Sequence, residues 1–138
     1  MIDDVGAIHA LYTRQSHLID TGDAAGWAAT FTPDGTFLSP TYPEPVHGLE
    51  ALTQFALDFA NTEDGIARHH VVSTVDVTDV GVKDARARAY LLIIETPEGG
   101  PSRLARLTTL HDRLAQSGEG WKVASREVVR HDGPRSEP

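Results

Sequence analysis

The first sixty residues place apolar side chains every three or four positions, which is the spacing of one helix face. Asp23 follows a Thr-Gly break and can cap the second of these segments. We therefore expect three helices, over residues 3–20, 23–31 and 49–61. Between the second and third, Pro33-Asp34-Gly35 predicts a turn, residues 36–39 predict a brief strand, and the proline-rich segment 40–45 predicts a loop.

Beyond Gly65 the apolar period changes from helical spacing to alternation, which is typical of strands. The alternation predicts long strands over residues 68–77, 85–96, 103–114 and 121–130. A parallel sheet would need a helix between successive strands, and none intervenes. The order of helices followed by a meander predicts an α+β fold with a mainly antiparallel sheet.

Composition limits the partners and the compartment. The 138 residues suit a single domain, expected over 1–131, with a polar tail over 132–138. Twelve Lys and Arg stand against 20 Asp and Glu without a basic cluster, so we expect no nucleic-acid partner. The absence of cysteine fits a cytoplasmic protein, and the absence of a long apolar run predicts no membrane span and no secretory signal.

Metal and cofactor motifs are also missing. The seven histidines show no His-x-x-x-His pair, and no glycine-rich phosphate loop or nucleophile elbow is present. The sequence therefore predicts no metal site and no nucleotide cofactor.

Three segments together resemble the SnoaL-like branch of the nuclear transport factor 2-like superfamily. They are YTRQSHLIDTGDAAGWAATF at 12–31, Arg-His-His at 68–70, and GWKVASR at 120–126. This superfamily includes polyketide cyclases, scytalone and bile-acid dehydratases and lindane dehydrochlorinase. The resemblance implies a cone-shaped fold, in which three N-terminal helices pack on a curved sheet around a pocket, and a homodimer.

The resemblance also implies a catalytic pair of Asp20 and a histidine on the first long strand. His69 and His70 face opposite sides of a strand, so only one can line the pocket. We predict His69, because it alternates with Val71, Ser73, Val75 and Val77. A neutral histidine can accept a proton, and a carboxylate can orient it. Alternatively, Asp20 binds backbone donors at the helix end and His69 is a hydrogen-bonded core residue.

The resemblance implies Arg126 as the third candidate catalytic residue, because it matches an arginine that in some relatives stabilises a departing anion or developing negative charge. A simple ion pair with a carboxylate is the alternative role. Tyr12, Trp27 and Tyr42 are candidate substrate-binding residues that could line the pocket, although aromatic residues at such spacing also form ordinary core.

The function implied is that of a cofactor-independent lyase, isomerase or cyclase that transfers a proton on a small hydrophobic or polyketide-like substrate. Either Asp20 or His69 could be the group that abstracts the proton. The competing hypothesis is a non-catalytic member that binds a ligand or a protein, as the small subunits of ring-hydroxylating dioxygenases do. The implied homodimer would pack through the outer sheet face, with contributions from Leu92, Ile94 and Leu107.

Overall fold

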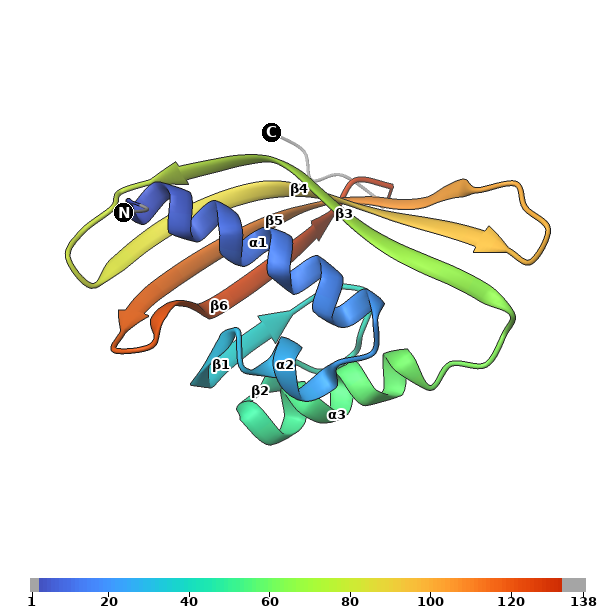
Figure 1. Cartoon of the computed structure of the whole chain (residues 1–138), viewed down its shortest axis with the longest axis horizontal. Coiled ribbons are helices and arrows are strands. Elements are labelled where there is room, and N and C mark those ends of the chain that lie inside the picture. The colour runs from blue at the N-terminus through green and yellow to red at the C-terminus, as the bar shows by residue number, and fades with distance from the viewer. Residues whose placement is uncertain (1–2, 133–138) are drawn as a thin grey trace.

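The computed structural model describes residues 3–132, so all of the predicted tail except Asp132 lies outside the described residues. Three helices pack against one six-stranded sheet that curves over them (Figure 1), which confirms the predicted α+β cone. None of the helices among the described residues is long and apolar enough to cross a membrane. The elements are α1 (Asp4–Asp20), α2 (Ala24–Ala28), β1 (Phe31–Leu38), β2 (Val46–His47), α3 (Leu49–Ala60), β3 (Ile66–Thr78), β4 (Asp84–Pro97), β5 (Arg103–Ser117) and β6 (Gly120–Arg130).

Aspartates cap the first two helices, as the sequence indicates. The side chain of Asp3 accepts a hydrogen bond from the Gly6 backbone N–H at 2.7 Å, and Asp23 accepts one from Gly26 at 2.8 Å. Helix α2 is shorter than predicted. It ends at Ala28 because Phe31 already pairs with β6, so strand pairing overrides the local helical pattern.

The strand order is β2-β1-β6-β5-β4-β3, and every adjacent pair is antiparallel except β1 with β6. The predicted turn at residues 33–35 is wrong. These residues lie inside β1, where the register against β6 shifts between Phe31 and Thr36. The turn-forming residues thus produce an irregularity within a longer strand.

A bulge in β3 exchanges the two faces of this strand halfway along its length. The register against β4 shifts between Ser73 and Asp76, and Thr74 has a φ of 55°. Before the bulge, His70 and Val72 face the helices, whereas after it Val75 and Val77 do so. Alternation therefore does not relate the two halves of β3.

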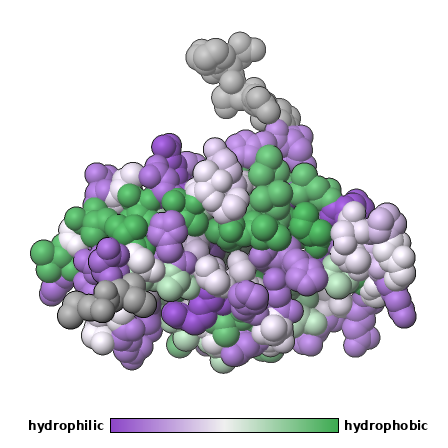
Figure 2. Space-filling view, turned by 45° about the horizontal axis from the view of Figure 1, so that its top comes forward, coloured by the Kyte–Doolittle hydropathy of each residue, from purple (hydrophilic) through white to green (hydrophobic). Residues whose placement is uncertain are grey.

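The inner sheet face and the helices enclose the core, which includes Leu11, Trp27, Leu52, Leu110 and Val123. The outer face has no helix over it and carries several exposed apolar side chains. Figure 2 shows an extended hydrophobic band on the face brought forward from the top of Figure 1, along which β3 and β4 run. This uncovered apolar face is therefore a candidate surface for contact with a second protein chain.

Candidate functional site

A partly open cavity of about 70 Å³ lies between the sheet and helices α2 and α3. Its wall is largely aromatic: the ring of Phe55 packs against Trp27, Phe37 and Tyr42, with ring centroids 5.6, 5.0 and 5.0 Å apart. Three basic side chains, those of His70, Arg106 and Arg126, also line the cavity. Such an apolar pocket with a few polar groups is typical of a small-molecule site.

His70 and Asp20 form the polar pair at this cavity. Nδ1 of His70 lies 2.7 Å from Oδ1 of Asp20, and the backbone N–H of His70 donates to both carboxylate oxygens at 3.1 Å. Both side chains are 15% exposed. A carboxylate acceptor at Nδ1 favours the tautomer that carries its proton there, so Nε2 has a lone pair. Among the described residues Nε2 has no hydrogen-bond partner, and the rings of His70 and Phe59 pack in an edge arrangement with their centroids 5.0 Å apart.

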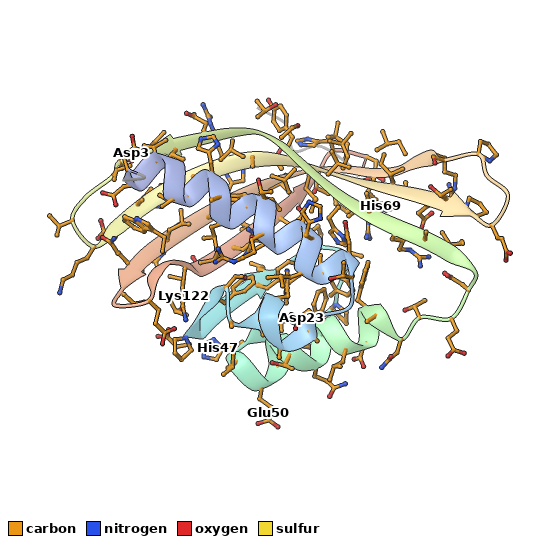
Figure 3. All side chains as sticks on the ribbon, viewed as in Figure 1. Asp3, Asp23, His47, Glu50, His69 and Lys122 are labelled. Atoms are coloured by element: carbon orange, nitrogen blue, oxygen red, sulfur yellow. The ribbon has the colours of Figure 1, made fainter. Side chains whose placement is uncertain are left out.

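The expectation that His69 contacts Asp20 and lines the pocket is wrong. His69 lies on β3 (Figure 3). It is exposed, lies opposite Ile94 on β4 and does not line the cavity. The physical reason is the bulge at Thr74. Val75 and Val77 face the helices after the bulge. Before the bulge the alternation is shifted by one residue, so that His70 and Val72 face the helices and His69 does not.

Arg126 lines the cavity from β6 and forms a buried ion pair. Its Nε and Nη2 donate to Asp112 of β5 at 2.9 and 2.8 Å, and Nη2 also donates to the Gln15 side chain at 2.8 Å. The Tyr12 hydroxyl donates to the same Asp112 carboxylate. Nη1 of Arg126 has no hydrogen bond within the described chain, yet no buried polar side-chain atom there is unpartnered, so Nη1 borders open space.

This cluster contains the strongest electrostatic perturbations of the site. Burial and the neighbouring Asp112 charge raise the pKa of Tyr12 far above its usual range, so the phenol stays protonated. Burial acts to lower the pKa of Arg126, but the charge and hydrogen bonds of Asp112 outweigh it, and the net direction is upward. Arg126 therefore remains a cation whose charge Asp112 balances.

The three predicted substrate-binding aromatics have different positions. Trp27 and Tyr42 line the cavity. Tyr12 does not: it is buried behind the cavity, where it donates to Asp112 and lies beneath the Arg126 guanidinium, 5.6 Å from ring centroid to Cζ.

Sequence reasoning missed Asp112, Gln15 and Arg106. Asp112 lies opposite Arg126 only through the β5–β6 register, which a shift between Arg113 and Leu114 makes hard to infer. Gln15 lies three residues after Tyr12, so helical spacing could have indicated a shared face. Among residues 3–132 no group of His, Asp and Glu side chains is arranged to hold a metal ion.

The fold and the pocket agree with the family that the sequence matches. The model of the SnoaL-like domain family matches residues 1–127, so the chain belongs to the SnoaL-like domain family. No curated protein matches the sequence.

Solved structures agree with the family assignment. ActVI-ORFA from Streptomyces coelicolor is 25% identical with a TM-score of 0.82, over 92% of this chain and 96% of that one. A protein from Catenulispora acidiphila, solved in complex with S-DNPA, is 27% identical with a TM-score of 0.76, over 88% of each chain. Rv3472 from Mycobacterium tuberculosis, a protein of unknown function, is 25% identical with a TM-score of 0.81, over 91% of this chain and 70% of that one.

Proposed function

We propose that this protein is an acid–base enzyme that abstracts a proton next to a carbonyl or similar activating group of a small hydrophobic substrate, with His70 as the proton-transfer residue and Asp20 as its partner. Elimination, isomerisation or ring closure would follow. The contact that carries the proposal is the 2.7 Å approach of His70 Nδ1 to Asp20 in the wall of an apolar cavity. The S-DNPA complex of the Catenulispora acidiphila protein supports a small-molecule ligand for this fold.

The geometry favours His70 over Asp20 as the base. His70 borders the cavity, whereas Asp20 does not line it and directs both oxygens at the imidazole and backbone N–H of His70. Asp20 would hold the tautomer with Nε2 free to take a proton, and would stabilise the imidazolium that forms. Nε2 would then return that proton to the leaving group or to another carbon of the substrate.

Arg126 would stabilise the negative charge that develops on the substrate oxygen as the proton leaves. Its Nη1 is the one guanidinium nitrogen that makes no protein hydrogen bond within residues 3–132. Because Asp112 and Gln15 hold the other two nitrogens, Nη1 would need little reorganisation when charge develops. Trp27 and Tyr42 would contact the apolar body of the substrate.

The test uses 1-indanone, an apolar ring ketone, in deuterated buffer, with incorporation of deuterium next to the carbonyl followed by NMR. We expect wild-type protein to accelerate exchange, and His70→Gln and Asp20→Asn each to remove most of the acceleration, by about 100-fold or more for the histidine. The double variant should lose little more than the worse single variant, because the pair acts as one unit.

His69→Gln is the matched control, because it removes the neighbouring, exposed histidine from the same strand. It should exchange at the wild-type rate. The proposal fails if wild-type protein binds 1-indanone without accelerating exchange, a result that would favour a non-catalytic ligand-binding protein. It also fails if His69→Gln is the inactive variant or if His70→Gln keeps full activity.

We also propose that the outer sheet face pairs with a second copy of this chain. The face carries Val71, Tyr90, Leu107 and Val129, each more than a third exposed, on four adjacent strands. Leu92, opposite both Val71 and Leu107, and Ile94 lie on the same face. An apolar surface on one face of the sheet can meet its own copy around a two-fold axis. A cytoplasmic location remains a prediction from the cysteine-free composition.

A further inference from the structure

The cavity contains a second arginine, Arg106, that the proposed proton transfer does not use. Arg106 lies on β5 opposite Ile93, whose side chain is buried, so its own side chain is on the inner sheet face. Unlike Arg126, it has no carboxylate within ion-pair distance in the described part of the chain. Its one hydrogen bond is a long contact of 3.4 Å from Nη1 to the Thr41 hydroxyl.

The acidic group on which the charge of Arg106 acts, Asp132, does not form an ion pair with it. The charge of Arg106 contributes to a lowered pKa of Asp132, but that shift is due mainly to Arg130. Arg130 donates to both oxygens of Asp132, at 2.9 and 2.6 Å. Asp132 is exposed, is already paired with Arg130 and does not line the cavity.

The side chains that line the cavity therefore carry a net positive charge. No Asp or Glu lines the cavity in residues 3–132, Arg126 is balanced by Asp112 behind it, and Asp20 faces His70. Within the described part of the chain, Arg106 is left without an ion-pair partner in a cavity lined by aromatic rings, in a protein whose formal net charge is -8. Guanidinium groups bind carboxylates with two parallel hydrogen bonds and gain strength where water is partly excluded.

We infer that the cavity binds a small molecule with an apolar body and a carboxylate, whose carboxylate is held by Arg106. The polar neighbours Thr41 and Ser39, which also line the cavity, lie on the segment after β1 and supply hydroxyl groups beside that position. The cavity of about 70 Å³ is smaller than the roughly 150 Å³ that holds a benzene ring. It can therefore hold a short chain or the inner part of a ring, while the rest of the ligand and its carboxylate lie at the partly open side.

This inference names the substrate class of the proposed enzyme and so rests on that function, but its test measures binding alone. Benzoate and benzamide have almost the same shape and differ in charge. The dissociation constant of each is measured at low salt by ligand-observed NMR and by tryptophan fluorescence, to which Trp27 in the cavity wall contributes. We expect benzoate to bind about tenfold more tightly than benzamide.

Arg106→Gln should abolish this preference by weakening the binding of benzoate more than that of benzamide. The matched control is Arg103→Gln on the same strand, which changes the net charge equally but removes an exposed arginine paired with Glu95, outside the cavity wall. Arg103→Gln should keep the preference. Thermal unfolding of both variants checks that they are folded.

Three results would overturn the inference: equal binding of benzoate and benzamide to wild-type protein, a preference that survives Arg106→Gln, or no binding of benzoate at tens of millimolar. None of these bears on 1-indanone exchange, which depends on His70 and Asp20. A failed carboxylate site and a failed proton-transfer function are therefore distinguishable.

Discussion

Replacing Asp112 with asparagine should destabilise the protein more than any other single loss of a charge. Its side chain is 0% exposed and that of Arg126 is 7% exposed. Asp112 accepts from Nε and Nη2 of Arg126 and from the Tyr12 hydroxyl. Asparagine keeps the shape but offers one acceptor in place of two, and its amide N–H groups would face other donors.

The magnitude follows from what Asp112→Asn leaves behind. Breaking a buried ion pair by removing one partner costs about 3–5 kcal/mol, because the other charge stays buried and uncompensated. A chain of 138 residues has a total stability of roughly 7–20 kcal/mol. With a urea slope of about 1.5 kcal/mol per molar, the unfolding midpoint should fall by about 2–3 M.

Urea unfolding followed by circular dichroism measures this loss, and Asp76→Asn is the matched control. Asp76 forms an ion pair with Arg88 on the neighbouring strand, but the two side chains are 47% and 68% exposed, so its loss should cost less than about 1 kcal/mol. A double-mutant cycle of Asp112→Asn with Arg126→Met should show a coupling of about 2 kcal/mol. The reasoning is refuted if Asp112→Asn costs no more than Asp76→Asn, or if the two changes at 112 and 126 are additive.

Three further changes test other parts of the structure. Tyr12→Phe should make the free energy of unfolding less sensitive to alkali. The pKa of Tyr12 is raised in the folded state, so the stability that this phenol contributes is complete below its unfolded pKa of about 10 and falls as the pH rises above that. Urea unfolding from pH 8 to 11 measures this loss, and equal pH dependence of the wild-type and Tyr12→Phe proteins would contradict it. Thr74→Gly should stabilise the fold by about 1 kcal/mol in thermal unfolding, because Thr74 has a φ of 55° that glycine adopts without strain; unchanged or lower stability would count against it. Leu107→Lys should convert a dimer to a monomer in sedimentation velocity, since a charge on the outer face cannot be buried there, and a monomeric wild-type protein would exclude the dimer.

The local pattern of the sequence determined the class of fold and most of its elements. Helical spacing followed by alternation is a short-range signal, and it placed α1, α3 and the four long strands to within a few residues. It also placed Asp20 at the end of α1, whereas Arg126 was indicated by the family resemblance, because a register shift between Val123 and Ser125 interrupts the alternation of β6 just before it.

Only the tertiary structure decided which histidine contacts Asp20. That choice depends on one residue, Thr74, whose left-handed backbone inserts an extra position and reverses the facing of the strand before it. Likewise, Asp112 reaches Arg126 through strand register, and Arg106 has a hydroxyl partner but no carboxylate partner within the described fold. Alternation gives the direction of each side chain relative to its neighbours, whereas bulges, register and pairing between distant strands depend on packing that no local pattern contains.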